Sequence, residues 1–243
     1  MKPLVILPTF NEVENIVEVL DRVREAVPEA DVLVVDDGSP DGTADRAEQW
    51  AEANGGGLSV LRRAGKQGLG SAYRAGFARG LDQGYDALIE MDSDLSHDPA
   101  SLPALISAVD SGADLAIGSR YVPGGSIPAW PKYREYLSRG GNRYASFLLG
   151  LQVRDATAGF RCYAASMLSQ IDLDTINADG YGFQIEMAYA VANRGGRIVE
   201  VPIRFTDRIR GTSKMSGRIV FEALVLVTWW AVRDRLLRRG HRA

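Results

Sequence analysis

The chain has 243 residues, of which 46% are hydrophobic and 24% charged, a composition that supports one packed globular domain and excludes a disordered or collagen-like chain. The formal net charge is −3, but residues 208–243 carry nine basic and two acidic side chains, so the C-terminal end is basic and the rest acidic. The single cysteine, Cys162, excludes an internal disulfide framework and a cysteine-based zinc site.

Short apolar runs alternate with helical patterns along the first half of the chain. Strands are expected at residues 4–7, 32–35, 58–61 and 87–91. The first helix is expected to end near residue 26, and two more are expected at 43–53 and 71–81. Asn11, followed three residues later by Glu14, predicts a cap for the first helix. Three strand–helix units in a row predict a doubly wound, mostly parallel α/β sheet flanked by helices.

The second half is less regular. Helices are expected at 99–111, 133–149 and 183–193, and strands at 113–118, 159–164 and 197–205. Pro202 predicts an edge position for the last strand, because proline cannot donate a ladder hydrogen bond. A final helix at about 216–239 is apolar, but its ten uncharged residues are too few to span a bilayer, which needs about 20.

Four segments follow predicted strands, where ligands of an open parallel sheet bind. They are residues 8–12, 36–39, 92–94 and 118–120. The carboxylates of these loops repel one another unless a cation offsets them, so a divalent metal is expected. The turn after the first strand lacks the glycines of a dinucleotide-binding motif, and the chain has no ATP-binding P-loop, which disfavours both classes of enzyme.

The chain contains two Asp-x-Asp motifs, and position distinguishes them. Asp92-Ser93-Asp94 directly follows a strand, where alternate residues point two carboxylates toward one cation. Asp172-Leu173-Asp174 has no strand before it and is more typical of helix capping. We therefore predict a metal site at the first motif. His97 beside it is left open between phosphate binding and a bond to local backbone.

Six segments together resemble the dolichyl- or polyprenyl-phosphate mannose synthases of glycosyltransferase family 2. They are LPTFNE (7–12), VVDDGSPDGT (34–43), KQGLGSAYRAG (66–76), MDSDLSHDP (91–99), GSRYVPGG (118–125) and DRIRGTSKM (207–215). The likeness extends from about residue 3 to residue 230. It implies a GT-A fold and an inverting enzyme that moves mannose from GDP-mannose to the phosphate of a membrane polyprenol, giving polyprenyl-phosphate mannose and GDP.

Site residues follow from the same resemblance by position. The implied donor and nucleotide site consists of Pro8, Thr9, Phe10, Glu12, Asp37, Asp92, Arg210 and Lys214. The implied ligands of Mg²⁺ or Mn²⁺ are Asp92 and Asp94, with Ser96 where some relatives carry glutamine. The acceptor phosphate is assigned to Arg120, Arg134 and Ser138, and catalysis to Asp94, Arg120 and Lys214. A phosphate monoester is already anionic at neutral pH, so no general base is expected.

The predicted organisation is a GT-A domain at 1–215 and an apolar, basic helix at 216–243. Trp229 and Trp230, followed by arginines, favour a membrane-facing helix, with burial against the domain as the alternative. Expected partners are GDP-mannose, polyprenyl phosphate and the cytoplasmic face of the membrane, and not nucleic acid. UDP-glucose as donor, a non-catalytic nucleotide-sugar-binding module and a separate membrane-anchoring subunit remain open. Trp130 either contacts the substrate or anchors its loop.

Overall fold

The computed structural model describes residues 1–207 and 223–233 of the chain. Seven strands form its framework: β1 (Pro3–Thr9), β2 (Asp31–Asp36), β3 (Leu58–Arg62), β4 (Ala87–Glu90), β5 (Leu115–Ser119), β6 (Arg161–Ala164) and β7 (Ile198–Pro202). The longer helices are α1 (Ile16–Ala26), α2 (Thr43–Ala53), α3 (Leu69–Asp82), α4 (Leu102–Asp110), α5 (Lys132–Leu149) and α7 (Gly180–Asn193). Shorter ones are η1 (Pro99–Ser101), α6 (Ala165–Leu168) and η2 (Leu173–Thr175).

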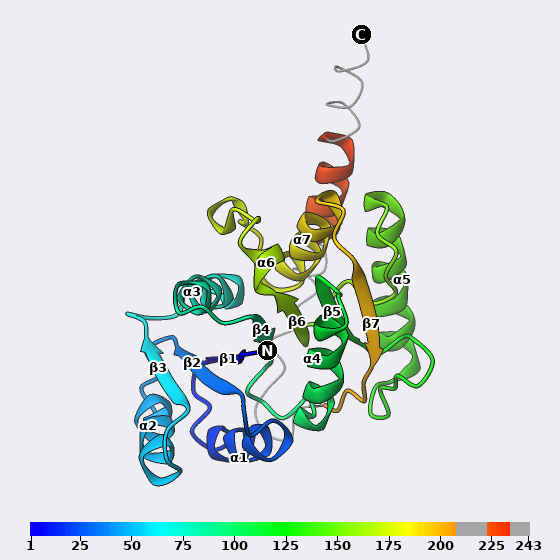
Figure 1. Ribbon diagram of the computed structural model, residues 1–243. Helices are drawn as coiled ribbons and strands as arrows, with labels where there is room; N and C mark the ends of the chain where they lie inside the picture. The colour runs from blue at the N-terminus through cyan, green and yellow to red at the C-terminus, as the bar shows by residue number, and fades with distance from the viewer. Residues whose placement is uncertain (208–222, 234–243) are drawn as a thin grey trace.

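The strands form one sheet in the order β3-β2-β1-β4-β6-β5-β7, with helices on both faces (Figure 1). Neighbouring strands run parallel except β6, which is antiparallel to both β4 and β5. The predicted doubly wound, mostly parallel α/β sheet is thereby confirmed. Strand β7 lies at one end of the order, which confirms the edge position expected from Pro202.

The sheet separates two hydrophobic layers, because successive side chains of a strand point to opposite faces. Leu4 and Ile6 of β1 belong to one layer, and Val5 and Leu7 belong to the other. This double burial explains why β1 and β2 are uninterrupted apolar runs in the sequence.

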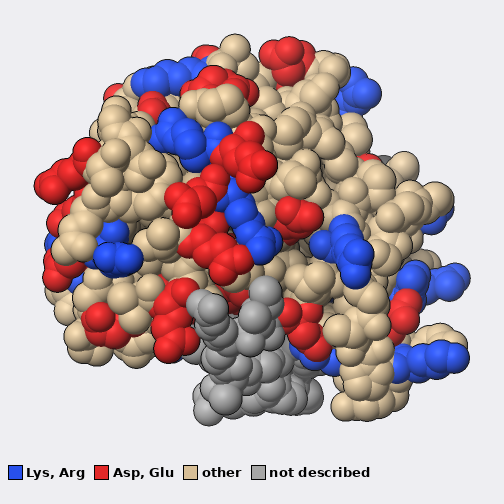
Figure 2. Space-filling view, turned by 90° about the horizontal axis from the view of Figure 1, so that it is seen from below, with Lys and Arg blue, Asp and Glu red and all other residues tan. Residues whose placement is uncertain are grey.

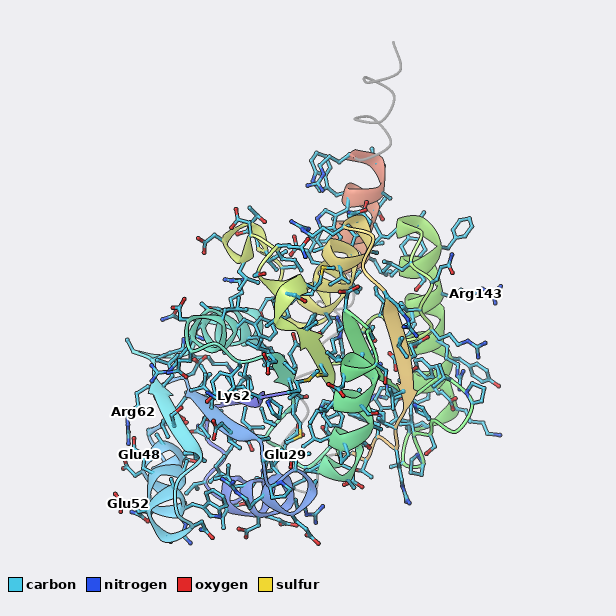
Figure 3. The ribbon with its side chains drawn as sticks, viewed as in Figure 1. Lys2, Glu29, Glu48, Glu52, Arg62 and Arg143 are labelled. Atoms are coloured by element: carbon cyan, nitrogen blue, oxygen red, sulfur yellow. The ribbon has the colours of Figure 1, made fainter. Side chains whose placement is uncertain are left out.

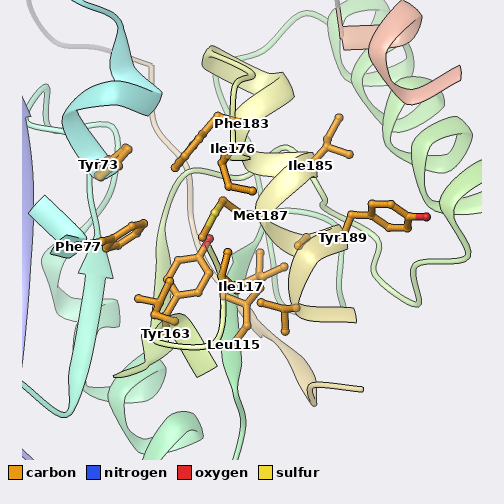
Figure 4. Packing of buried hydrophobic residues seen from close by; sticks show 14 of the residues in the cluster. Tyr73, Phe77, Leu115, Ile117, Tyr163, Ile176, Phe183, Ile185, Met187 and Tyr189 are labelled. Atoms are coloured by element: carbon orange, nitrogen blue, oxygen red, sulfur yellow. The ribbon is translucent and has the colours of Figure 1, made fainter. Parts of the chain in front are cut away.

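The first layer is rich in aromatic side chains from α3, β6 and α7 (Figure 4). Tyr73 stacks on Phe77 and on Phe183, with ring centroids 6.2 and 6.1 Å apart. Phe77 meets Tyr163 edge to face at 5.3 Å. These contacts join α3 and α7, which are far apart in the sequence, into one support for the same side of the sheet.

The start of the first helix differs from the prediction. Asn11 has a positive φ of 60°, a left-handed conformation that asparagine tolerates, and α1 begins only at Ile16 after an N-cap residue without a side-chain hydrogen bond. The expected cap from Asn11 and Glu14 is therefore wrong. The backbone N–H of Asn11 instead donates to Ser39 Oγ, which ties the loop after β1 to the loop after β2.

Surface charge is distributed unevenly. Acidic side chains gather near the middle of the face in Figure 2, with basic side chains among them. At the edge of the sheet, Arg62 of β3 binds Glu48 and Asp45 of α2 in an exposed cluster, while Arg143 extends outward from α5 (Figure 3).

The predicted last helix is described only at residues 223–233, which are helical. Val227 and Trp230 of this helix pack into the first hydrophobic layer, while Val225, Trp229 and Val232 are exposed. Thr228 Oγ1 lies 2.8 Å from the hydroxyl of Tyr144 on α5. The alternative prediction, burial against the domain, therefore holds for one face of this helix, and the other face is exposed. Among the described helices, none is long and apolar enough to cross a bilayer.

Candidate active site

The four predicted loops lie at the same edge of the sheet, because β1, β2, β4 and β5 point in one direction. Thr9 is paired with Asp36 in the register of β1 and β2. Glu90 at the end of β4 and Ile117 of β5 both pair with Arg161 at the start of β6. The Asp92–Asp94 loop and the Arg120 loop thus flank the same point of β6.

The loop after β1 is held by hydrogen bonds to the loop after β2. Thr9 Oγ1 donates to Asp36 Oδ1 at 2.9 Å, and the backbone N–H of Glu12 donates to Thr43 Oγ1 at 2.9 Å. Pro8 contributes its carbonyl oxygen, which accepts a hydrogen bond from Ser93 of the Asp-x-Asp loop. The predicted nucleoside-binding residues of β1 are therefore connected to both acidic loops.

Asp37 has partners that the sequence prediction did not include. Arg63, just after β3, forms a buried ion pair with Asp37, with Nη1 3.2 Å from Oδ1. The backbone N–H of Gln67 donates to the other oxygen at 3.2 Å. In the same loop, Lys66 Nζ lies 5.1 Å from the centre of the Phe10 ring, within the range of a cation–π interaction. The segment after β3 therefore adds cations to this part of the site.

The Asp-x-Asp loop is compact. Asp94 is buried, and its Oδ1 accepts a hydrogen bond from the backbone N–H of Ser96 at 3.0 Å. Between them, Leu95 has a φ of 64°, a conformation that costs energy for a leucine and that clusters at functional sites. The Tyr73 hydroxyl donates to Asp92 Oδ1 at 3.4 Å.

His97 packs against the Asp-x-Asp loop and holds its backbone. Its Nδ1 accepts a hydrogen bond from the backbone N–H of Asp92 at 3.2 Å, and its ring stacks on Phe160 and meets Phe205 edge to face. The structure thus gives His97 a bond to local backbone, one of its two predicted roles. The second motif also matches its prediction, since the Asp172 side chain caps η2 by accepting from the N–H of Asp174.

The donor set of the Asp-x-Asp loop fits a hard divalent cation. Within the described ranges, no three His, Cys, Asp or Glu side chains converge to form a metal site by themselves. Mg²⁺ and similar ions are commonly held by one or two carboxylates together with substrate phosphates and water, so Asp92 and Asp94 could hold such an ion together with a diphosphate. Ser96 is buried and shapes the loop through its backbone.

Glu90 lies beneath this loop as a fully buried carboxyl group. Burial raises the pKa of Glu90 to about 7, although the nearby charge of Arg161 acts in the opposite direction. Arg161 is itself fully buried and donates to the carbonyl oxygens of Ala156, Ala158 and Gln184. The floor of the site therefore contains two ionisable groups from neighbouring strands.

Arg120 follows β5 and is tightly fixed. Its Nε and Nη2 donate to the two oxygens of Asp155 at 2.7 and 2.6 Å, and Nη2 also donates to Thr157 Oγ1. Burial opposes the charge of Arg120, but Asp155 outweighs this effect and holds the pKa of the guanidinium above its ordinary value. This bidentate geometry is specific for arginine and leaves Nη1 for a further acceptor.

Ser138 of α5 belongs to the same hydrogen-bonded network. Its hydroxyl accepts from Tyr121 at 2.7 Å, and its carbonyl accepts from Asn142 at 2.9 Å. Asn142 also donates to Thr157, the residue that accepts from Arg120. The structure therefore brings together two of the three residues predicted for the acceptor phosphate, through partners absent from that prediction.

Arg134, the third of these residues, lies on α5 over the ring of Trp130, with its guanidinium carbon 3.9 Å from the ring centre. The Trp130 indole N–H donates to Asp207 at 2.9 Å, and Arg134 Nη1 lies 3.5 Å from the same carboxylate. Trp130 thus anchors its loop. Arg210 and Lys214 lie outside the described residues, so their predicted role is not placed in this geometry.

A pocket that is partly open to solvent lies between α5, the start of α7 and the helix at 223–233. Arg134 and Ser138 line it together with Tyr181 and apolar side chains, including Leu137, Ile185 and Val227. A group with an anionic head and an apolar body matches this lining.

Residues that the sequence prediction missed are mainly partners of predicted ones. They are Arg63, Lys66, Asp155, Thr157, Asn142 and Tyr181. Arg63 directly follows β3, and this position at the end of a strand could have identified it. Asp155 and Tyr181 do not follow a strand, so their positions in the sequence carry no such indication.

The known sequences that resemble this chain agree on one family of enzymes. The family model described as Glycosyl transferase family 2 matches residues 4–172. The chain is 54% identical over 235 residues to an undecaprenyl-phosphate mannosyltransferase of Micrococcus luteus, covering 97% of this chain and 96% of that protein. It is 50% identical to a polyprenol monophosphomannose synthase of Mycolicibacterium smegmatis, covering 98% and 89%. A dolichol-phosphate mannosyltransferase of Pyrococcus furiosus is 35% identical, with 98% of this chain and 67% of that protein covered.

Solved structures agree on the fold. Glucosyl-3-phosphoglycerate synthase from Mycobacterium tuberculosis, in complex with Mn²⁺, UDP-glucose and phosphoglyceric acid, superposes with a TM-score of 0.70 at 20% identity, covering 95% of this chain and 79% of that one. The same enzyme with phosphoglyceric acid alone also gives a TM-score of 0.70, covering 93% and 78%. This similarity confirms the predicted GT-A type of fold.

Proposed function

The chain belongs to glycosyl transferase family 2, and from this premise we propose that it moves mannose from GDP-mannose to the phosphate of a membrane polyprenol. The products are polyprenyl-phosphate mannose and GDP, and the configuration at the sugar carbon inverts. The observation that carries the proposal is the pocket in which Arg134 and Ser138 meet an apolar lining. The relatives named for the same transfer, at 54% and 50% identity, support it.

On the donor side, Asp92 and Asp94 would hold Mg²⁺ or Mn²⁺ against the diphosphate of GDP-mannose. A divalent cation at this place offsets the charge that develops on the departing GDP. Thr9, Phe10, Glu12 and Asp37 would receive the nucleoside, with Arg63 keeping the Asp37 carboxylate in place. Arg210 and Lys214 are assigned to phosphates of donor or product by the family resemblance.

On the acceptor side, the attacking group is a phosphate oxygen that is already negatively charged. It needs a defined position more than a base, because no proton has to be removed before attack. Arg120 through Nη1, together with Arg134 and Ser138, would supply that position. A single displacement with the acceptor opposite the leaving group accounts for inversion.

A polyprenyl phosphate resides in a bilayer, and the surface beside the pocket suits membrane contact. On α5, Tyr133, Tyr136 and Phe147 are 74%, 73% and 79% exposed. Trp229 on the helix at 223–233 is 61% exposed. Aromatic rings at the level of lipid headgroups are typical of interfacial helices, so the protein would bind peripherally to the cytoplasmic face, with α5 joining the predicted C-terminal helix.

Transfer of radiolabelled mannose from GDP-mannose into organic-extractable lipid tests this function. The assay contains purified protein, a polyprenyl phosphate and Mg²⁺ or Mn²⁺, with EDTA as the control. We expect label in the lipid phase only when the metal is present. UDP-glucose, offered in parallel under the same conditions, is expected to give far less product.

Two results would contradict the proposal. Transfer from UDP-glucose without transfer from GDP-mannose would keep the mechanism but reject mannose as the sugar. Binding of nucleotide sugars without turnover, in the presence of lipid vesicles, would indicate a binding module. For the membrane contact, a chain cut after Ile219 should bind nucleotide normally and vesicles less, and unchanged vesicle binding would reject a membrane-facing C-terminal helix.

A further inference from the structure

Tyr181 occupies the first turn of α7, at the boundary between the two halves of the site. It lines the pocket together with Arg134 and Ser138. The turn itself is fixed, because the Asp179 carboxylate accepts hydrogen bonds from the backbone N–H of Gly180 and from that of Gly70 at the start of α3. The backbone position from which the Tyr181 side chain enters the pocket is therefore fixed.

The charges around the Tyr181 phenol come from both sides of the site. Arg120 and Arg134 on the acceptor side and Asp92 on the donor side all interact with it electrostatically, as does the Tyr121 hydroxyl. Arg120 follows β5, Arg134 is on α5 and Asp92 is in the loop after β4, so these charges reach the phenol from three different elements. The region around the phenol is the one in which the acceptor phosphate must approach the sugar of the donor.

We propose that Tyr181 is a further catalytic residue, whose phenol donates a hydrogen bond to an oxygen of the acceptor phosphate and orients it for attack. This inference rests on the proposed function. In the reaction, a bond forms between a phosphate oxygen and C1 of mannose, and the bond from C1 to the β-phosphate oxygen of GDP breaks with its electron pair going to GDP. Tyr181 keeps its proton throughout.

A neutral donor suits this position. Burial raises the pKa of Tyr181, although Arg120 and Arg134 lower it, so the hydroxyl stays protonated at neutral pH and remains able to donate. Hydrogen bonds to a charged acceptor are stronger than neutral ones. The phenol would therefore fix one phosphate oxygen without adding another charge beside the two arginines.

The substitution Tyr181→Phe removes only the hydroxyl and tests the proposal. Loss of a hydrogen bond to a charged group predicts a decrease of about 10- to 100-fold in kcat/KM for a short-chain polyprenyl phosphate. Binding of GDP-mannose should be unchanged, because the phenol is proposed to contact the acceptor phosphate and not the donor. Tyr189→Phe is the matched control, since Tyr189 lies further along the same helix and Figure 4 shows it pointing away from Phe183.

The outcomes separate this inference from the proposed function. The inference about Tyr181 would be overturned if Tyr181→Phe had the same kinetics as the wild type. It would also be overturned if Tyr181→Phe lost GDP-mannose binding to the same extent as kcat/KM, or if the Tyr189→Phe control lost as much kcat/KM as Tyr181→Phe. If the wild type transfers no mannose, the proposed function fails. In that case, calorimetric titration of the wild type and of Tyr181→Phe with a short-chain alkyl phosphate decides whether Tyr181 binds the phosphate group. Weaker binding by Tyr181→Phe alone supports the inference, and equal binding rejects it.

Discussion

The Asp92–Asp94 loop and the Arg120 region, which we propose as the donor and acceptor sides of the site, are built in different ways. Asp92 and Asp94 follow a parallel strand, and they accept hydrogen bonds from a phenol and from a backbone N–H. Arg120 instead has its charge balanced inside the protein by the carboxylate of Asp155, which is 35 residues away in the sequence. The proposed donor side would therefore be completed by a cation that binds with the substrate, whereas the proposed acceptor side depends on a buried partner supplied by the fold.

Removal of the buried partner should have the largest effect. Asp155→Ala leaves the Arg120 guanidinium buried without its counter-charge, and we expect the free energy of unfolding to fall by about 3–5 kcal/mol. Urea unfolding followed by circular dichroism measures this. Asp45→Ala, which removes an exposed partner of Arg62, is the control and should change stability little. Similar stability of the two variants would contradict the proposed dependence on internal balance.

On the donor side, a substitution should affect activity and leave the fold intact. We expect Asp94→Asn to reduce metal-dependent transfer about 10²- to 10³-fold, because stabilisation of the leaving GDP is weakened. Asp174 lies in η2, in the second Asp-x-Asp motif, for which no metal site is predicted. The variant Asp174→Asn should therefore retain full activity. The rates are measured by the lipid-extraction assay at saturating acceptor. Equal loss in both variants would remove the distinction between the two motifs.

The buried Glu90, beneath the Asp-x-Asp loop, predicts how the free energy of unfolding changes with pH. Its pKa is raised in the folded protein to about 7, so the folded state retains a proton that the unfolded chain loses at lower pH. The contribution of Glu90 to stability is therefore fully present below the unfolded pKa and is lost as the pH rises through about 7. The shift corresponds to a loss of about 3 kcal/mol.

The difference in unfolding free energy between the wild type and Glu90→Gln isolates this contribution from other titrating groups. Between pH 4.5 and pH 8 the wild type should lose stability relative to the variant, since glutamine does not titrate. A constant difference across this range would show that Glu90 has an ordinary pKa.

The smallest expected effect concerns the outer face of the acceptor side. Phe147→Ser removes one exposed ring from α5, and partial loss of its burial in lipid, worth about 1 kcal/mol, predicts roughly fivefold weaker binding to anionic vesicles. Co-sedimentation with vesicles measures the affinity. Glu52→Ser on α2, far from α5 in Figure 3, is the control. Unchanged binding of Phe147→Ser would place the membrane contact elsewhere.

The fold and the donor loops were largely predictable because their signals are local. Uninterrupted apolar runs predicted β1 and β2, and position after a strand distinguished Asp92-Ser93-Asp94 from Asp172-Leu173-Asp174. The start of α1 was missed, because the left-handed Asn11 is stabilised by Ser39 from another loop.

The doubly wound, mostly parallel sheet and the loops at its strand ends could therefore be predicted from the sequence, since periodicity and strand ends act over a few residues. The groups that surround Arg120 could not be predicted in this way, because they are brought to it by the fold. Asp155, Asn142 and Tyr181 lie on three separate segments and show no distinguishing pattern in the chain. Burial of the Arg120 charge is costly without a paired carboxylate, and the loop between α5 and β6 brings Asp155 into bidentate contact with it.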